Sequence, residues 1–123
     1  MKGYIHDVLD KALENTYFRQ VLETGEHTQI VVMSIAPEEE IGMETHKNND
    51  QVLYFVQGEG RATLNGQETP FKKGDIFLVQ AGTEHNFKNT GVQDLKIITA
   101  YSPPHHPQGT IHKTKDEAAK AEY

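Results

Sequence analysis

A succession of short β-prone runs, each ended by a turn signal, constrains the fold of this chain most strongly. The dipeptide Asn65-Gly66 lies between two alternating runs and predicts a type I′ hairpin turn, which needs positive φ at both positions. Strands of this length and spacing, without helix–strand alternation, predict an all-β sandwich or barrel. The predicted strands are residues 19–24, 28–36, 41–46, 51–57, 60–64, 67–71, 75–79, 85–89 and 95–101.

The segments on either side of the β-rich part differ from it in composition. Residues 4–13 carry apolar residues at roughly helical spacing, which predicts a short helix or a loosely docked arm. After Tyr101 the run Ser-Pro-Pro-His-His-Pro excludes a central strand, because proline has no N–H for a β-ladder. Residues 115–122 are polar and alanine-rich, as in a frayed helix or a disordered tail. We expect an N-terminal arm at 1–17, a β-barrel domain at 18–102 and a C-terminal extension at 103–123.

The composition narrows the classes of partner. A length of 123 residues predicts one domain, and 12 basic against 18 acidic residues give a formal net charge of -6. The basic residues are scattered, which argues against a nucleic-acid partner. No apolar run approaches a membrane span and the N-terminus lacks the apolar core of a signal peptide, so we expect no membrane partner and a cytoplasmic location. The chain has no cysteine, so a metal site must use histidine and oxygen ligands.

Strand parity groups four polar side chains. Alternate residues of a strand face the same side, so Glu44 and His46 share a face. On the next predicted strand, Gln51 shares its face with Leu53, and His85 begins a later strand with an apolar residue on the same face. If these faces look into a barrel, the polar side chains converge above an apolar floor, which is the usual composition of a small-molecule site.

Two sequence motifs make the chain similar to the cupin superfamily, whose members fold as a double-stranded β-helix or jelly roll. The second cupin motif is G-x5-P-x-G-x2-H-x3-N. It matches from Gly74 through Gly82 and His85 to Asn89, with Gln80 at the usual proline position.

The first cupin motif, H-x-H-x3-4-E-x6-G, matches in one register only. Glu44 and His46 then take the two histidine positions, Gln51 takes the acid position and Gly58 is the closing glycine. Starting the motif at His46 instead loses both the acid and the closing glycine. The resemblance extends over nearly the whole chain, to small bacterial single-domain cupins with a Glu-x-His-x4-Gln motif, which are loosely grouped with phosphomannose isomerases.

The resemblance implies one divalent metal ion per chain, with Mn, Fe, Zn, Ni and Co as the candidates. Its implied ligands are Glu44, His46, Gln51 and His85. The common cupin set of three histidines and one glutamate carries one negative charge, and so does this set, because the carboxylate has moved from one strand to another. Gln51 either binds the metal or hydrogen-bonds a ligand and orients it.

The implied function is a metalloenzyme acting on a small polar metabolite. An isomerase-like reaction, on a sugar or sugar phosphate, comes first and a metal-dependent dioxygenase second. The alternatives are a non-catalytic small-molecule-binding cupin and a metal-free structural cupin. The catalytic residues stay unknown: Tyr54, Tyr101 and His105 are candidates for a general acid or base, although parity points Tyr54 out of the barrel.

Two further features bear on the surroundings of the site. The His105-His106 pair, flanked by prolines, is interpreted as a surface loop or as part of a lid over the barrel mouth. Exposed sheet edges and an apolar outer face are commonly covered by self-association, so we expect a homodimer.

Overall fold

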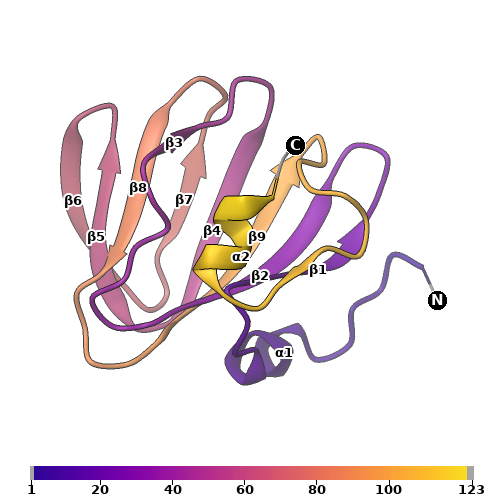
Figure 1. Ribbon diagram of the computed structural model, residues 1–123, viewed down its shortest axis with the longest axis horizontal. Helices are drawn as coiled ribbons and strands as arrows, with labels where there is room; N and C mark the ends of the chain where they lie inside the picture. Colours follow the sequence, from indigo (N-terminus) through magenta and orange to yellow (C-terminus); the bar gives the residue numbers. More distant parts are fainter. Residues whose placement is uncertain (1, 122–123) are drawn as a thin grey trace.

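Two antiparallel β-sheets that share one core form the computed structural model, which describes residues 2–121 (Figure 1). One sheet has the order β10-β1-β2-β9-β4-β7 and the other the order β3-β8-β5-β6. The predicted all-β jelly roll is therefore confirmed. The elements are α1 (Val8–Glu14), β1 (Arg19–Thr24), β2 (Gln29–Ile35), β3 (Glu44–Thr45), β4 (Asp50–Gln57), β5 (Glu59–Leu64), β6 (Gln67–Lys72), β7 (Ile76–Val79), β8 (Glu84–Asn89), β9 (Leu95–Ser102), β10 (Ile111–His112) and α2 (Lys115–Lys120).

The largest departure from the predicted strands lies before β3. Glu38 and Gly42 have positive φ values of 70° and 110°, which interrupt the extended backbone, and Glu40 makes only an isolated bridge with Lys88. The strand predicted at residues 41–46 is therefore reduced to the two residues of β3, which pair with β8. Within residues 2–121 no ladder connects one sheet to the other, so the expectation of a closed barrel was wrong.

The hairpin between β5 and β6 follows its turn signal. Asn65 and Gly66 have φ values of 47° and 82°, the left-handed values that a type I′ turn requires. The turn sets the register in which Gly60 pairs with Phe71, and β5 in turn pairs with β8, the strand that carries His85.

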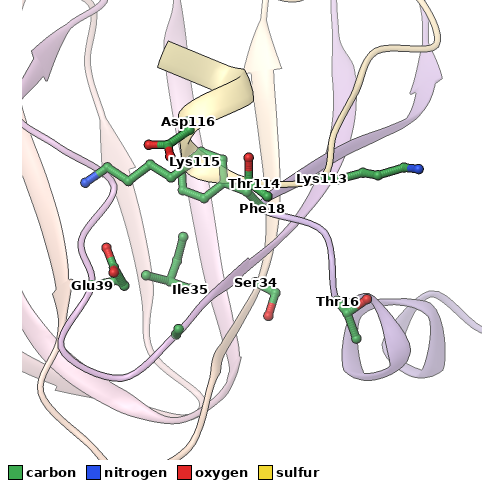
Figure 2. A pocket seen from close by; sticks show the side chains of 10 residues that line it. Thr16, Phe18, Ser34, Ile35, Glu39, Lys113, Thr114, Lys115 and Asp116 are labelled. Atoms are coloured by element: carbon green, nitrogen blue, oxygen red, sulfur yellow. The ribbon is translucent and has the colours of Figure 1, made fainter. Parts of the chain in front are cut away.

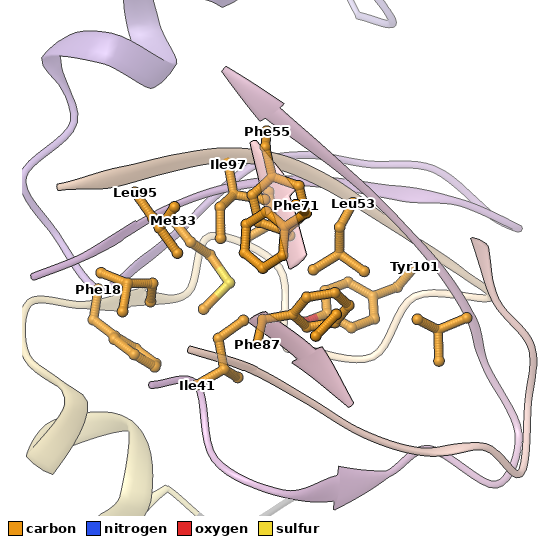
Figure 3. Close-up of a cluster of buried hydrophobic side chains, with 14 of the residues drawn as sticks. Phe18, Met33, Ile41, Leu53, Phe55, Phe71, Phe87, Leu95, Ile97 and Tyr101 are labelled. Atoms are coloured by element: carbon orange, nitrogen blue, oxygen red, sulfur yellow. The ribbon is translucent and has the colours of Figure 1, made fainter. Parts of the chain in front are cut away.

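The core lies between the sheets and is built around phenylalanine rings (Figure 3). Phe55 and Phe87 are completely buried, with ring centroids 5.6 Å apart, and Phe71 lies 4.1 Å from Phe55. Phe77 is partly buried and meets Phe55 edge-on at 5.9 Å. Burying one such side chain contributes about 1.5–3 kcal/mol. Tyr54 alternates to the outer face and is 37% exposed, as parity predicted.

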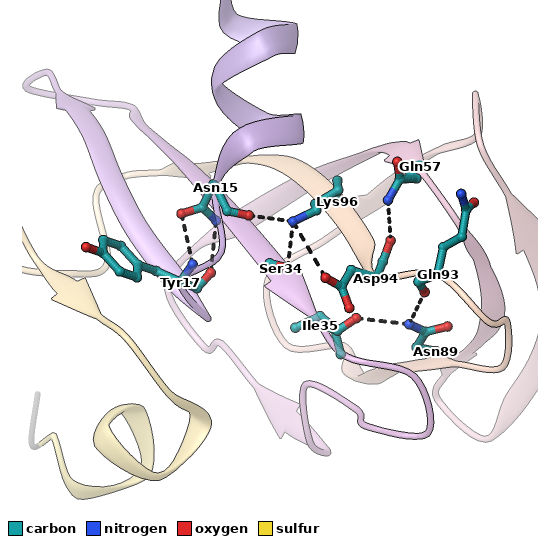
Figure 4. Close-up of polar contacts among 9 residues, drawn as sticks. All are labelled: Asn15, Tyr17, Ser34, Ile35, Gln57, Asn89, Gln93, Asp94 and Lys96. Carbon is teal, nitrogen blue, oxygen red and sulfur yellow. Dashed lines mark hydrogen bonds and ion pairs between the residues drawn. The ribbon is translucent and has the colours of Figure 1, made fainter.

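The N-terminal arm is fixed by a helix and a buried lysine. Ala12 of α1 is fully buried against the outer face of the six-stranded sheet. Lys96 of β9 donates from Nζ to the Asn15 carbonyl at 2.6 Å and to Ser34 Oγ at 3.1 Å (Figure 4). Of the two predicted alternatives, the arm is therefore a helix, and it is docked.

The C-terminal extension returns to the sheet before α2. Ile111 and His112 form β10, which pairs with β1 and was not predicted, since two residues show no alternation. Thr114 then caps α2 by accepting a hydrogen bond from the Glu117 N–H at 3.1 Å, and Ala118 packs against the core. Among residues 2–121, no helix combines the length and apolar character needed to cross a membrane.

Candidate metal centre

The register of β3 against β8 brings three of the predicted ligands together. Glu44 lies directly opposite His85 in the ladder, and His46 follows two residues after Glu44. One ligand atom from each of the three residues lies within 4.8 Å of the others. His46 Nε2 is 3.3 Å from Glu44 Oε1, and His85 Nε2 is 3.9 Å from the same oxygen. The three residues form a candidate metal-binding site of one carboxylate and two imidazoles.

Burial removes the two imidazoles from water and leaves the carboxylate at the open side. His85 is 1% exposed and His46 is 8% exposed, with ring centroids 5.2 Å apart. The Glu44 side chain keeps 32% of its surface accessible. A ligand therefore reaches this group from the side of Glu44.

The backbone fixes the tautomer of His85. Its Nδ1 lies 2.8 Å from the Thr83 carbonyl oxygen, which can only accept a hydrogen bond, so Nδ1 carries the proton. The Nε2 atom is then a bare lone pair, buried and without a hydrogen-bond partner in residues 2–121. A backbone carbonyl on the distal nitrogen is the usual arrangement for a metal-binding histidine.

A chain of hydrogen bonds orients the fourth predicted ligand, Gln51. The Thr99 hydroxyl donates to the Val52 carbonyl at 2.7 Å, so it accepts from Gln51 Nε2 at 3.0 Å. This assignment leaves Gln51 Oε1 as a buried acceptor that no described group satisfies. An unsatisfied buried acceptor costs about 1–3 kcal/mol, and a cation would offset that cost. The amide oxygen therefore fits the metal that the resemblance implies.

The electrostatic environment keeps Glu44 ionised. Burial by itself raises the pKa of this carboxyl, but its close contact with His46 and the charges of His46, His85 and Arg19 outweigh burial. The net effect is a pKa below the ordinary value for glutamate. The group is thus an anionic oxygen at neutral pH, which suits a candidate metal ligand.

The Ser102–Pro107 loop packs against the site and is held by buried Gln29. Gln29 Oε1 accepts from the N–H groups of His105 and His106 at 3.2 and 3.0 Å, and Gln29 Nε2 donates to the His106 carbonyl at 2.7 Å. Asn49 binds the Pro103 carbonyl of the same loop. The loop is therefore attached to β2 and to the residues before β4.

Aromatic contacts place His105 beside the candidate ligands. Its ring centroid lies 4.4 Å from that of His46 and 5.5 Å from that of Tyr101, on which it stacks. Burial, followed by the charge of His46, lowers the pKa of His105. Of the candidate acid–base residues, His105 and Tyr101 are thus near the site, whereas Tyr54 lies on the outer face.

Arg19 is a residue of this region that the sequence reasoning missed. It is 7% exposed on β1 and lines, together with Glu44, His105 and His106, a cavity of about 200 Å³. The sequence could have indicated this position, because alternate residues of a strand share a face and Arg19 lies two residues before inward-facing Val21.

A neighbouring cavity of about 350 Å³ has different chemistry (Figure 2). Phe18 and Lys115 line both cavities, but none of the candidate metal ligands lines the larger one. Its polar lining comes from Thr16, Ser34 and Glu39, with residues 113–116. The smaller cavity is therefore the one in which reactive groups gather.

Two histidine nitrogens, one carboxylate and one amide oxygen form a donor set that suits divalent ions such as Fe(II) and Mn(II). An ion held by these four donors would keep positions open for other ligands. Such an ion can polarise an oxygen of a bound metabolite, activate water or, as iron, bind dioxygen.

Comparison with known proteins agrees with the fold. Residues 31–101 match the family model described as Cupin domain. The Bacillus subtilis protein YrkC is 40% identical over an alignment of 128 residues. The alignment covers 98% of this chain and 68% of YrkC. Among solved structures, BH2720 of Bacillus halodurans is 36% identical with a TM-score of 0.95, covering 98% of this chain and 96% of its own. A predicted oxalate decarboxylase of Thermotoga maritima is 26% identical with a TM-score of 0.60, covering 64% and 69%.

Proposed function

Because the chain belongs to the cupin family, we propose that it is a metal-dependent protein that acts on a small polar metabolite. The observation that carries this proposal is a set of buried acceptors. The Nε2 atoms of both histidines and Oε1 of the glutamine are buried and make no hydrogen bond in residues 2–121. An ion held by the two imidazoles and Glu44 would serve the nitrogens, and the glutamine oxygen is the proposed fourth ligand. The proposed ligands are Glu44, His46, Gln51 and His85.

The donor set limits the identity of the ion. A 2-His-1-carboxylate group with an added amide oxygen suits Fe(II) and Mn(II), while Co(II), Ni(II) and Zn(II) also accept such ligands. With no cysteine in the chain, a thiolate-bound ion is excluded. We propose one ion per chain.

The first candidate reaction is an isomerase-like rearrangement of a sugar, a sugar phosphate or a similar metabolite. When bound, the ion supplies Lewis acidity at an oxygen of the metabolite. The protein supplies His105, which lies beside His46 and is placed to move a proton. The phenylalanine core below the site and the Gln29-bound loop beside it limit the access of water.

The second candidate, a metal-dependent dioxygenase, rests on the ligand types themselves. Two histidines and one carboxylate are the ligand set of non-haem Fe(II) oxygenases. The two candidates differ in the ion they need: the dioxygenase requires iron and consumes dioxygen, while the isomerase works with a redox-inactive ion and without oxygen.

Metal analysis of protein purified without chelator tests the proposal. We expect about one divalent ion per wild-type chain, and its loss in His46→Ala and in His85→Ala, because each substitution removes a buried donor. His27→Ala is the matched control, since the His27 side chain is 85% exposed. Stoichiometric metal in both ligand variants, or none in the wild type, would contradict the proposal. Reaction assays with the loaded protein, with and without oxygen, then separate the two reactions.

We further propose that a second copy of the chain covers the β7 edge. Ile76 and Leu78 of this edge strand are 64% and 59% exposed, and Tyr54 lies opposite Ile76 on β4. A two-fold axis at β7 would pair the strand with its own copy and cover these side chains. A sedimentation mass of one chain at micromolar concentration would exclude this homodimer.

A further inference from the structure

We propose that Arg19 forms an anion-binding subsite beside the metal centre, so that the metabolite carries a carboxylate or phosphate group. The inference rests on the proposed function and specifies the chemical class of its ligand. It comes from a residue outside the stretch that matches the family model.

Arg19 is a buried cation that forms no ion pair within residues 2–121. Only 7% of its surface is exposed. Its Nη1 donates to His112 Nδ1 at 3.2 Å, whereas its Nε makes no hydrogen bond among the described residues. A buried charge without an ion-pair partner is strongly destabilising, so the position of this guanidinium needs a reason.

The neighbours of Arg19 on β1 and β10 hold it in place without forming an ion pair with it. Arg19 pairs with His112 across the β1–β10 ladder, and its guanidinium carbon lies 5.2 Å from the centre of the Phe18 ring. Burial, followed by the charge of Arg19, lowers the pKa values of His106 and His112. These two imidazoles are therefore neutral neighbours of the guanidinium.

Arg19 and Glu44 line the same cavity, which joins the cation to the metal centre. The cavity measures about 200 Å³, and one water molecule takes up about 30 Å³ of the liquid, so the space suits a metabolite of a few heavy atoms. Lys115 at the start of α2 lines it as a second cation. A metabolite that binds the ion through one oxygen therefore lies close to the guanidinium.

Charge favours an anion in this cavity. A divalent ion, the Glu44 carboxylate and the Arg19 guanidinium together leave a net positive charge, which a carboxylate or phosphate would reduce. The guanidinium also offers parallel N–H donors that match the two oxygens of a carboxylate or phosphate. The structure therefore supports a short hydroxy or oxo acid, or a small phosphate ester, over a neutral sugar.

The test measures ligand affinity on Co(II)-loaded full-length protein by calorimetry, with the cobalt absorption spectrum as a second readout. The probes are glycolate, inorganic phosphate and glycolamide, the neutral analogue of glycolate. We expect the wild type to prefer at least one anion to glycolamide. Arg19→Met should weaken binding of that anion at least tenfold and leave cobalt content and glycolamide affinity unchanged. The glycolate and phosphate titrations distinguish a carboxylate from a phosphate ligand.

Arg61→Met is the matched control, because Arg61 is the other arginine of the chain and is exposed on β5. Unchanged anion affinity in Arg19→Met, or no preference of the wild type for either anion, would overturn the inference. If Arg19→Met does not fold, Arg19→Lys keeps the charge, removes the fork of donors and is judged by the same loss of affinity. Failure of the wild type to hold cobalt would instead refute the proposed function, and anion titration of the metal-free protein then decides the subsite alone.

Discussion

Replacing Gln51 with glutamate should destabilise the metal-free protein and tighten metal binding. Gln51 is 2% exposed, and its Nε2 donates to Thr99, a bond that a carboxylate cannot make. Loss of this bond costs about 1 kcal/mol. Burial also raises the pKa of a carboxyl by about 2 units or more, and each unit corresponds to about 1.4 kcal/mol for the ionised group. The free energy of unfolding in EDTA should therefore fall by about 4 kcal/mol.

A bound ion should reverse part of this loss. The variant adds a negative charge at the proposed ligand position, so the Kd for Mn(II) should fall by at least about tenfold, or about 1.4 kcal/mol. The ion binds the folded state, so the gain in binding free energy adds to the stability of the variant. With saturating metal, the difference in free energy of unfolding between variant and wild type should therefore shrink by about 1.4 kcal/mol.

Urea unfolding followed by circular dichroism, once in EDTA and once with saturating Mn(II), measures both effects, and a competition titration gives the Kd directly. Gln67→Glu is the matched control, because Gln67 is exposed on β6 and its change should stay within about 0.5 kcal/mol. The reasoning is refuted if Gln51→Glu loses the same stability with and without metal and its Kd equals that of the wild type. Gln51 Oε1 would then not face the ion.

Two further substitutions test the packing and the titration of the fold. Phe55→Ala should lower the free energy of unfolding by about 3–5 kcal/mol, because the ring is completely buried. Tyr54→Ala on the outer face should change it by about 1 kcal/mol. Equal urea midpoints for the two variants would contradict this. Burial, followed by the charge of Arg19, lowers the pKa of His106 from 6.5 to about 2, so below pH 6.5 the unfolded chain takes up a proton that the folded chain does not. The stability contributed by neutral His106 should be complete above pH 6.5 and lower by about 2 kcal/mol at pH 5. In His106→Gln the free energy of unfolding, measured with urea at each pH, should depend less on pH. Parallel pH profiles for variant and wild type would refute the assignment.

The strands were within reach of the sequence because their signals are local, and the motif resemblance named all four proposed ligands. The alternation in β4 and the Asn65-Gly66 turn define strands and registers over a few residues. Motif spacing then relates Glu44 and His46 to His85, whose meeting across the β3–β8 ladder the structure shows. Parity alone also directed Tyr54 outward.

Other features depend on contacts between distant parts of the chain, and no local pattern reports them. β10 is too short to alternate, and its pairing with β1 is visible only once the extension has turned back. The contact of His105 with His46 depends on the bonds that Gln29 makes with the loop. The strand predicted at residues 41–46 is shortened because Glu38 and Gly42 adopt positive φ values, and a glutamate gives no sequence signal for such a conformation.

The attachment of the Ser102–Pro107 loop to Gln29 has a consequence for modularity. The stretch that matches the family model, residues 31–101, carries all four proposed ligands but not Gln29, Arg19 or His105. A graft or truncation limited to that stretch would keep the donors and lose the wall that encloses them, together with the strand pairing that positions it. The smallest transferable unit of this site therefore runs from β1 through β10, and selectivity can diverge between relatives while the metal ligands stay the same.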